Sequence, residues 1–456
     1  MKLFKLIPLI FLLMSTTTGC STSTESPERL IKKPIVNESK LGISNAISKS
    51  LTVGYSLVLP NNSMETGKIN EVDLDNDDTN EIVAFEKKEG STNNENEVGF
   101  MVLSKNKDGS YTDKGKIWEK GDSIEYANFY DLDSDGNKEI VLLVKSTDKT
   151  NMYIYKFKNG EINKVYTLNP TWLEDKDELL DMKIKIGNID KNKGLDILMF
   201  HYNSKNNQMY ASLAEFKETL KVIDHVKFEN VKNLSDLHIT IGNVTKDIKG
   251  VILDYTTLKE SNNITQILYI ENNKINKAFD DNDKNLMKAY YIPTEDMNKD
   301  KIIEIPILNG KANGSTYTLK SASNVSWYKW NGKIGKDSGL VFINQIYYNY
   351  QYTYKILVPN NLVNKLYVEQ EYPGENILFK FIYYDTLNSE SKELFTICAI
   401  NKSAIDENKN MSNKTGVKLN ETEDYIFSLY TKNTEELKKL NITVETLKDY
   451  FSLIYE

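Results

Sequence analysis

The stretch Asp131-Leu132-Asp133-Ser134-Asp135-Gly136-Asn137-Lys138-Glu139 is followed directly by the apolar run Ile140-Val141-Leu142-Leu143-Val144. A second acidic stretch, Asp73-Leu74-Asp75-Asn76-Asp77-Asp78-Thr79-Asn80-Glu81, precedes Ile82-Val83-Ala84-Phe85 in the same way. Weaker copies begin at Asn188, Asn243 and Asp296, so the five copies start 58, 57, 55 and 53 residues apart. A regular spacing of this length is typical of repeat proteins, most often propellers or solenoids.

The segments around each acidic motif indicate four strands in every repeat. In the second repeat, a strand at residues 126–129 leads into the motif, and residues 140–144 form the strand that follows it. An aromatic-rich segment at residues 152–157 comes next, and Asn159-Gly160 connects it to a fourth strand at residues 164–168. An Asn-Gly pair between two such segments is a strong hairpin signal. Four strands are the content of one propeller blade.

We therefore predict a mainly β fold in which residues 46–339 form a β-propeller. Five blades are favoured, and six or seven remain as alternatives. A strand at residues 52–59 is expected to complete the last blade and close the ring, because closure removes exposed sheet edges. A chain of 456 residues is too long for one ordinary core, which is consistent with a second domain.

The repeat ends near residue 340, and residues 340–456 are predicted to form a separate small α+β domain. Tyr348, Tyr350, Tyr352 and Tyr354 alternate with polar residues, so we expect the four rings to share one strand face, most simply as packing and alternatively as a ligand surface. Two helices are expected near residues 434 and 443. Asn433 and Glu436 match a helix N-terminal signature, and Val444, Leu447, Phe451 and Ile454 share the face of the second helix.

The acidic motif is suited to calcium, which prefers six to eight oxygen ligands in a flexible arrangement. Acids at positions 1, 3, 5 and 9, a backbone carbonyl at position 7 and a turn at position 6 would enclose such an ion. The ligands expected from the three best copies are Asp131, Asp133, Asp135, Asn137 and Glu139; Asp73, Asp75, Asp77, Thr79 and Glu81; and Asp296, Asn298, Asp300 and Glu304. The bound calcium would be structural, and the alternative is that these loops are solvated acidic turns.

The number of acids ranks the copies. The Asp131 copy is complete and has Gly136 at the turn, and the Asp73 copy has four acids with Asp78 there. The Asp296 copy comes third, with Lys301 at the turn, and the Asn188 copy has two formal charges, on Asp190 and Asp196. The Asn243 copy has Thr245 and Val251 where acids would stand, so no metal is expected in it. Affinity should fall in this order.

The first residues indicate export and a lipid anchor. Lys2 and Lys5 precede an apolar run that is too short to span a bilayer as a permanent helix. Thr17-Thr18-Gly19-Cys20 resembles a bacterial lipobox, which implies a signal peptide at residues 1–19 and lipidation of Cys20 on the extracytoplasmic face of a cell membrane. An ordinary secretory signal is the alternative. Residues 20–45 are polar and are predicted to form a flexible tether.

Composition and motifs argue against several function classes. The net charge of −8, without a dense stripe of cations, argues against nucleic acid as a partner. No catalytic motif surrounds His201, His225 or His238, so no catalytic residue is assigned. Cys398 lies in an apolar segment and is expected to be a buried hydrophobic residue rather than a nucleophile. Trp327 and Trp330 are expected to serve packing, on opposite faces of a bent or bulged strand.

The Asp131 and Asp73 copies resemble the FG-GAP or VCBS-type repeat of integrin-α-like β-propellers, over residues 52–335. The whole layout is similar to bacterial surface lipoproteins built from such repeats. This resemblance implies calcium-binding loops on a propeller that serves as a binding or scaffold module. We predict a lipid-anchored, non-enzymatic envelope protein that binds an unidentified protein or glycan. The alternatives are an extracytoplasmic polysaccharide hydrolase or lyase on the same scaffold and, less favoured, a solute receptor, which would show βαβ patterns.

Overall fold

The computed structural model describes residues 38–88, 96–147, 149–167, 180–189, 194–258, 263–281, 283–288, 291–308, 322–374, 376–385, 390–404 and 416–455. The fold is mainly β, and its strands form six antiparallel sheets. The predicted signal peptide, Cys20 and most of the predicted tether lie outside the described residues. No helix among the described residues is long and apolar enough to cross a membrane.

The first three sheets correspond to the first three sequence repeats. The first contains β1 (Tyr55–Leu57), β2 (Ile69–Val72), β3 (Glu81–Lys88), β4 (Glu97–Lys105) and β5 (Tyr111–Lys120). The second contains β6 (Ser123–Tyr130), β7 (Glu139–Lys145), β8 (Thr150–Lys158) and β9 (Glu161–Thr167). The third contains β10 (Leu180–Gly187), β11 (Asp196–Asn203), β12 (Gln208–Phe216) and β13 (Leu220–Phe228).

Two further sheets follow from the last two repeats. The fourth contains β14 (His238–Asn243), β15 (Lys249–Thr256), β16 (Asn263–Glu271), β17 (Lys274–Lys277) and β18 (Met287–Lys288). The fifth contains β19 (Ile305–Leu308), β20 (Ala322–Trp330), β21 (Leu340–Asn349), β22 (Tyr354–Leu357) and β28 (Phe451–Leu453). Short 3₁₀ helices are η1 (Lys284–Leu286), η2 (Gly335–Asp337), η3 (Asn360–Leu362) and η4 (Lys402–Ala404).

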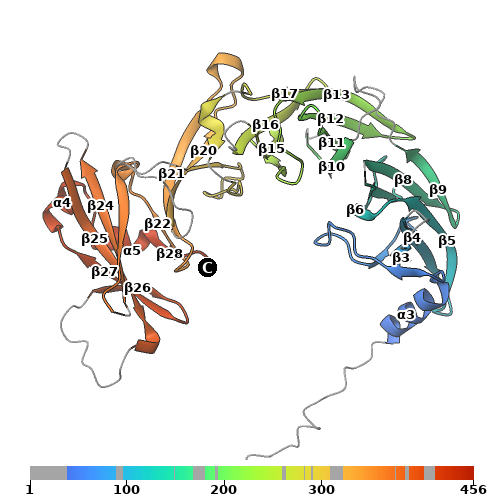
Figure 1. The fold of residues 1–456 in the computed structure, drawn as a ribbon, viewed down its shortest axis with the longest axis horizontal. Helices are drawn as coiled ribbons and strands as arrows, with labels where there is room; N and C mark the ends of the chain where they lie inside the picture. The colour runs from blue at the N-terminus through green and yellow to red at the C-terminus, as the bar shows by residue number, and fades with distance from the viewer. Residues whose placement is uncertain are drawn as a thin grey trace, which may run out of the picture.

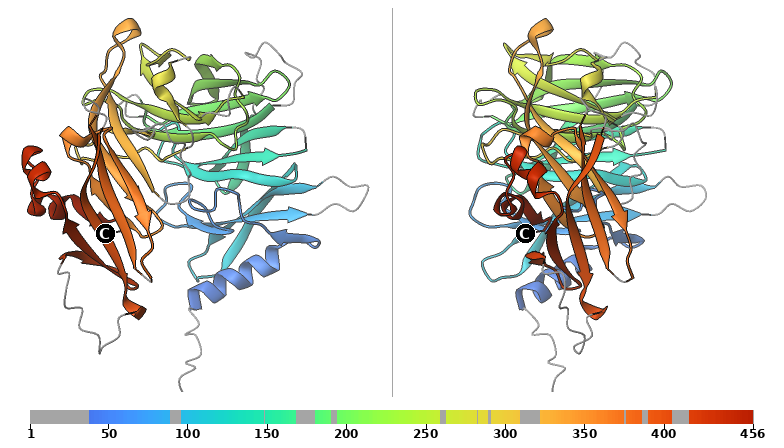
Figure 2. Two further views of the ribbon diagram at one scale, coloured as in Figure 1. Left: turned by 60° about the vertical axis from the view of Figure 1, so that its left-hand side comes forward. Right: turned by 90° about the vertical axis from the view of Figure 1, so that its left-hand side faces the viewer.

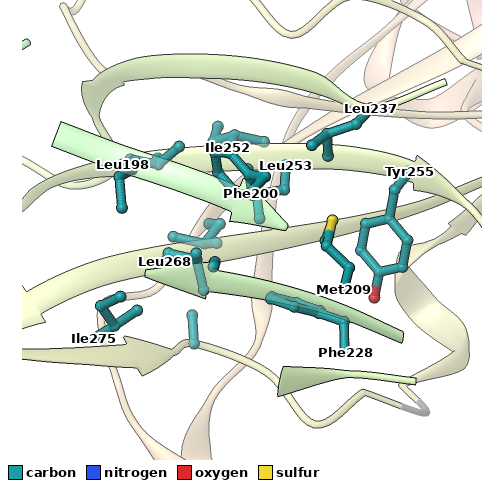
Figure 3. Packing of buried hydrophobic residues seen from close by; sticks show 14 of the residues in the cluster. Leu198, Phe200, Met209, Phe228, Leu237, Ile252, Leu253, Tyr255, Leu268 and Ile275 are labelled. Atoms are coloured by element: carbon teal, nitrogen blue, oxygen red, sulfur yellow. The ribbon is translucent and has the colours of Figure 1, made fainter. Parts of the chain in front are cut away.

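The strand after each acidic motif is apolar throughout because both of its faces are buried between sheets. In β7, Ile140 and Leu142 pack against the first sheet, whereas Val141 and Leu143 pack against the third. A larger cluster joins the third and fourth sheets and continues to Trp330 of the fifth, and Figure 3 shows part of it around Phe200 and Phe228. Continuous apolar runs, rather than alternating ones, are typical of strands buried on both faces.

The hairpin prediction is confirmed in the second repeat, and the fourth repeat has a similar turn. Asn159 and Gly160 join β8 to β9 with φ values of 54° and 77°. Asn272 and Asn273 join β16 to β17 with φ values of 53° and 58°. Two consecutive positive φ angles match the hairpin turn that asparagine and glycine favour.

The predicted ring closure is wrong. The five sheets follow one another along an arc, with the first and fifth sheets at its two ends (Figure 1). Residues 55–57 form β1, which pairs with β3 of the first sheet and not with the last one. Among the described strands, none of the fifth sheet pairs with the first.

Helix α3 (Glu38–Ser50) covers the outer face of the first sheet. Figure 2 shows this helix beside the sheet, and its buried Ile43 and Ile47 pack against Ile82, Ala84 and Met101. In a closed ring this face would have to meet the last blade, whereas here a helix shields it from water. Residues 38–45 are therefore part of the folded protein, which corrects the predicted tether boundary.

The predicted domain boundary at residue 340 is also wrong. β21 pairs with β20 across a bulge between Trp327 and Tyr328, so the fifth sheet continues to residue 357. The sheet gains its last strand when β28 pairs with β22. The two tryptophans are buried in different clusters, Trp327 beside Tyr348 and Trp330 beside Tyr269, as expected for packing residues around a bulge.

The four tyrosines do not share one strand face, because β21 ends at Asn349 and a turn follows. Tyr348 stacks on the exposed Tyr350 with ring centroids 5.4 Å apart. Tyr352 and Tyr354 instead pack into the core of the C-terminal domain. Thr353, with a φ of 55°, makes the turn that interrupts the alternation.

The C-terminal domain contains one sheet and two short helices. The sheet contains β23 (Leu366–Glu371), β24 (Ile377–Asp385), β25 (Glu390–Asn401), β26 (Val417–Glu421) and β27 (Tyr425–Thr431). Helices α4 (Thr434–Lys439) and α5 (Val444–Tyr450) begin after Asn433 and Thr443, whose side chains accept hydrogen bonds from backbone N–H groups. Helix α5 ends at Tyr450 rather than continuing to Ile454, because residues 451–453 form β28.

Candidate metal centres

Each acidic motif lies in the loop before an apolar strand of its sheet, namely β3, β7, β11, β15 or β19. In three of these loops, the structure brings carboxylate oxygens within 4.8 Å of one another: Asp73, Asp75 and Glu81; Asp131, Asp133 and Glu139; and Asp296, Asp300 and Glu304. The predicted gathering of acids is confirmed for these nine residues, whereas the predicted ligands Asp77 and Asp135 do not belong to the clusters. Such clusters are suited to a hard divalent cation.

One hydrogen bond fixes the shape of four of the five loops. The backbone N–H at position 2 donates to the carboxylate at position 9, from Leu74 to Glu81 (3.2 Å) and from Leu132 to Glu139 (2.8 Å). Ile189 and Met297 make the same bond to Asp196 and Glu304, each at 2.8 Å. The acid at position 9 is thus held at the base of the loop with one oxygen occupied.

The side chain at position 2 anchors each loop in the core. Leu74 is buried between the first and second sheets, and Leu132 between the second and third. Ile189 and Val244 are buried in the cluster of the third and fourth sheets. Backbone bonds link neighbouring loops, from Lys138 N–H to the Leu74 carbonyl and from Ile303 N–H to the Asn243 carbonyl, both at 2.9 Å. A cation in one loop would therefore stabilise contacts between sheets.

The carboxylate at position 1 closes the turn. Asp73 accepts the N–H groups of Asp77 and Asp78 at 3.2 and 3.1 Å. Asp296 accepts those of Asp300 and Lys301 at 3.0 and 2.8 Å. Position 6 has a positive φ in all three clusters, 65° at Asp78, 92° at Gly136 and 70° at Lys301, as predicted from the motif.

In the Asp73 loop, free oxygen atoms face one another. Asp75 Oδ1 is buried and has no hydrogen-bond partner among the described residues. Burial, together with the charges of Asp77 and Asp73, raises the pKa of Asp75. Burial also raises the pKa of Glu81, which accepts one bond from the Ser104 hydroxyl at 3.2 Å. A divalent cation would supply both the missing ligand contacts and the missing positive charge.

In the Asp131 loop, the ammonium group of Lys156 lies among the acids. Its Nζ is 2.5 Å from Asp133 Oδ2, 3.2 Å from Asp135 Oδ2 and 3.2 Å from Glu139 Oε1. Burial alone would lower the pKa of Lys156, but the hydrogen bonds to Asp133 and Glu139 outweigh it and raise the pKa. Three carboxylates are thus already neutralised in part by a residue of the same chain.

In the Asp296 loop, a buried carboxylate oxygen lacks a partner. Glu304 is fully buried, its Oε2 accepts the Met297 N–H, and its Oε1 has no hydrogen-bond partner among the described residues. Burial raises the pKa of Glu304. Lys329 Nζ stays 3.7 Å from Asp300 Oδ2, at the outer side of the loop. These oxygens fit a cation, as they do in the Asp73 loop.

The other two loops are poorer in acids. In the Asn188 copy, Lys249 Nζ donates to Asn188 Oδ1 at 3.0 Å, while Asp190 and Asn192 lie outside the described residues. In the Asn243 copy, the Thr245 hydroxyl accepts the N–H groups of Asp247 and Ile248. Val251, at position 9, is a buried residue of β15.

Sequence reasoning missed Lys156, Ser104 and Lys329, which occupy the same place in three sheets. Ile82 pairs with Leu103, Ile140 with Tyr155 and Ile305 with Tyr328, so the next residue of each partner strand stands beside the acid at position 9. Their distances along the chain from that acid differ because the intervening loops differ in length. No fixed spacing could have identified them.

Residues of β6 and β10 line a polar hollow of about 380 Å³. These two strands lie at the inner side of the arc (Figure 1). Charged residues of the hollow pair across it, Lys145 with Asp181 at 3.2 Å and Lys185 with Glu65 at 3.6 Å. The ammonium group of Lys183 donates to the Leu237 carbonyl at 3.1 Å. This arrangement offers hydrogen-bonding groups of both signs to a polar ligand.

The histidines and Cys398 do not belong to this hollow. His201 is fully buried in β11, and burial lowers its pKa to about 4. His238 of β14 stacks on Tyr291 at a centroid distance of 3.6 Å. Cys398 is a buried free thiol of β25 whose pKa is raised by burial, as expected for a hydrophobic residue rather than a nucleophile.

Comparison with known proteins adds little. No family model and no curated protein matches the chain. The structure of exotype rhamnogalacturonan lyase YesX aligns with a TM-score of 0.34 and 12% identity over 73% of this chain; the alignment spans 66% of the lyase, just under two thirds of its length. A protein from Lactobacillus plantarum aligns with a TM-score of 0.26 and 9% identity, over 66% of this chain and 91% of that one. Likenesses this weak support no argument about function.

Proposed function

We propose that the protein is a lipid-anchored binding or scaffold module of the bacterial cell envelope, built on propeller-type blades of the FG-GAP or VCBS kind and stabilised by calcium. The proposal that the protein binds calcium rests on the acidic loops at Asp73 and Asp296. Each presents a buried carboxylate oxygen without a hydrogen-bond partner among the described residues, on Asp75 and on Glu304. A cation bound only by the folded chain adds stability by mass action.

The blade assignment rests on the repeat and on the way its sheets stack. Each repeat forms an antiparallel sheet of four or five strands, and four strands are the content of one propeller blade. The structure describes an arc with a helix over the first sheet, so the proposed arrangement is an open array of five blades. Calcium in the loops would hold neighbouring blades together, because the loops contact one another through backbone hydrogen bonds.

A binding role is favoured over catalysis by the chemistry of the inner hollow. Two of its three acids are paired with lysines, and neither histidines nor Cys398 line it. The third, Glu125, accepts hydrogen bonds from Asn61 and Ser123. A catalytic centre requires a group with a free proton or lone pair placed near the reacting atoms. A hollow of paired charges instead suits hydrogen bonding to a polar ligand such as a glycan or a protein loop.

The lipid anchor is supported by the sequence Thr17-Thr18-Gly19-Cys20 alone, since these residues lie outside the described part of the chain. Membrane fractionation of bacteria that express the full chain tests it directly. The wild-type protein should be recovered with membranes and incorporate a labelled fatty acid, and Cys20→Ser should do neither. Equal labelling of the two proteins would contradict the anchor.

Thermal unfolding tests the calcium part. The full chain with Cys20→Ser is heated in excess calcium, in excess magnesium and in chelator. We expect calcium to raise the unfolding temperature by several degrees, since occupancy at about 100 times Kd adds about 2.7 kcal/mol per site. Magnesium should act weakly because it demands a stricter octahedral geometry. Identical unfolding temperatures in calcium and in chelator would mean that the loops are turns that bind no calcium.

A further inference from the structure

We propose that the Lys156 ammonium group is the resident cation of the Asp131 loop, so that the loop with the most complete acidic motif binds no calcium. This inference rests on the proposed calcium sites and assigns calcium to only two of the three loops. The Asp73 and Asp296 loops bind the ion, and the Asp131 loop does not. The residue responsible, Lys156, lies on β8 and is not part of the acidic motif.

The first argument is geometric. Calcium lies 2.3–2.6 Å from its oxygen ligands. Lys156 Nζ lies 2.5 Å from Asp133 Oδ2 and 3.2 Å from Asp135 Oδ2 and Glu139 Oε1. The ammonium nitrogen therefore stands where an ion bridging these three oxygens would have to stand. The ammonium group donates hydrogen bonds to Asp133 and Asp135 and forms an ion pair with Glu139.

The second argument is the confinement of Lys156. Its side chain is about 20% exposed, and Phe216 of the third sheet lies 5.9 Å from Nζ at the ring centroid. Glu139 beneath it is fully buried. An incoming calcium ion would have to displace Lys156 and leave its positive charge beside an ion of the same sign. Like charges at such distances repel strongly where water is excluded.

The third argument comes from the equivalent positions in the other sheets. Ser104 stands beside Glu81 and contributes only a neutral hydroxyl, which can remain next to a bound cation. Among the described acids of its loop, Lys329 pairs only with Asp300, with its Nζ 3.7 Å from Asp300 Oδ2, and makes no ion pair with Glu304. Among these three loops, the ammonium group enters the cluster of acids only in the Asp131 loop.

Two single variants, Lys156→Ser and Ser104→Lys, test the proposal. Each one places in one loop the side chain that the other loop has at the equivalent position. Calcium binding to the full chain with Cys20→Ser is measured by calorimetric titration with calcium chloride. We expect Lys156→Ser to bind one more calcium ion per chain than the parent, and Ser104→Lys to bind one fewer. An unchanged number of sites in Lys156→Ser would overturn the proposal.

Hydrogen exchange of the parent protein gives a second measurement that needs no variant at position 156. Calcium should slow amide exchange in residues 73–81 and leave residues 131–137 unchanged. Lys138 is left out of the comparison because its N–H bonds to the Leu74 carbonyl of the calcium loop. Asp133→Asn should destabilise the protein equally in calcium and in chelator without changing the number of bound ions. Calcium-dependent protection of residues 131–137, or loss of a calcium ion in Asp133→Asn, would contradict the proposal.

The outcomes also separate this inference from the proposed function. A parent protein that binds no calcium, beside a Lys156→Ser variant that binds one ion, would refute the calcium sites and uphold the role of Lys156. A parent protein that binds three ions would uphold calcium and refute the role of Lys156.

Discussion

Ser104 and Lys156 stand at the same place in two neighbouring sheets, and each contacts the glutamate that ends its acidic loop, at 3.2 Å in both cases. One contributes a hydroxyl and the other a positive charge. The number of acids ranks the Asp131 loop first for calcium, whereas the Lys156 ammonium group, which lies among the acids of this loop, favours the Asp73 and Asp296 loops. A ranking of metal sites from the loop alone omits the residue that faces it from the adjoining strand.

Calcium stabilisation should weaken as the pH falls. Burial raises the pKa of Glu81 and of Glu304, so the metal-free folded state binds more protons than the unfolded state at and above the ordinary glutamate pKa. The metal-free fold therefore gains stability as the pH falls, while calcium must displace those protons. We expect the difference in unfolding temperature between calcium and chelator to shrink steadily from pH 8 to pH 5. A constant difference would mean that these two carboxylates do not bind the ion.

His201 should make the fold sensitive to acid. Burial lowers its pKa from the ordinary 6.5 to about 4, so the unfolded state binds a proton that the folded state excludes. Stability from this group is complete above pH 6.5 and is lost progressively down to pH 4, at a cost of about 3 kcal/mol. When the pH is lowered from 7 to 4, the free energy of unfolding of the parent should fall by about 3 kcal/mol more than that of His201→Gln. Urea unfolding measures this, with the exposed His225→Gln as control; matching losses in His201→Gln and the parent would contradict the assignment.

The buried pair Asp254 and Lys288 should tolerate joint replacement better than the loss of one partner. Lys288 Nζ lies 2.8 Å from Asp254 Oδ1, and both side chains are almost completely buried. Asp254→Asn leaves a buried charge unpaired and should cost about 3–5 kcal/mol. Asp254→Leu combined with Lys288→Met should cost much less. Chemical denaturation compares them.

The matched control for that pair is Asp281→Asn. Lys277 and Asp281 form a pair of similar length, 2.7 Å, in which Asp281 is 42% exposed. Loss of an exposed pair should cost less than about 1 kcal/mol. Similar costs for Asp254→Asn and Asp281→Asn would show that the burial of Asp254 does not matter.

Gly99 and Gly42 should respond to alanine in opposite directions. A Cβ atom at Gly99 of β4 would lie 1.8 Å from the Ile117 carbonyl oxygen of β5, so Gly99→Ala must push two paired strands apart and should cost about 3 kcal/mol or more. Gly42 lies in α3 with open space around it, so Gly42→Ala should stabilise the protein by about 0.5–1 kcal/mol. Thermal unfolding of the two variants distinguishes these signs, and a stable Gly99→Ala protein would refute the close approach of β4 and β5.

The local features of this fold could be predicted from the sequence, and the long-range ones could not. The acidic motif and its spacing indicated five repeats of antiparallel strands and the positive φ at Asp78, and the Asn159-Gly160 pair indicated a hairpin turn. Each depends on residues adjacent in the chain. The covering of the first sheet by α3 and the pairing of β28 with β22 depend on partners far apart in sequence.

The boundary at residue 340 shows the same limit. β21 is rich in apolar and aromatic residues whichever sheet it joins, so its composition cannot tell the fifth blade from a new domain. The tyrosine alternation from residue 348 to 354 satisfied the period of a strand, but the turn at Thr353 interrupts it. β21 belongs to the fifth sheet because it pairs with β20, and no local sequence pattern encodes that pairing.

Ile356 of β22 pairs with Phe451 of β28, so the chain leaves the fifth sheet and returns to it at one point. Everything between these two residues, from β23 to α5, is therefore an insertion at what would otherwise be a simple hairpin turn. Insertions whose two ends lie side by side are the kind that proteins accept most readily. The C-terminal domain is a module that evolution can graft, exchange or delete, provided that the aromatic face of Tyr354 and Phe451 beneath it is repacked.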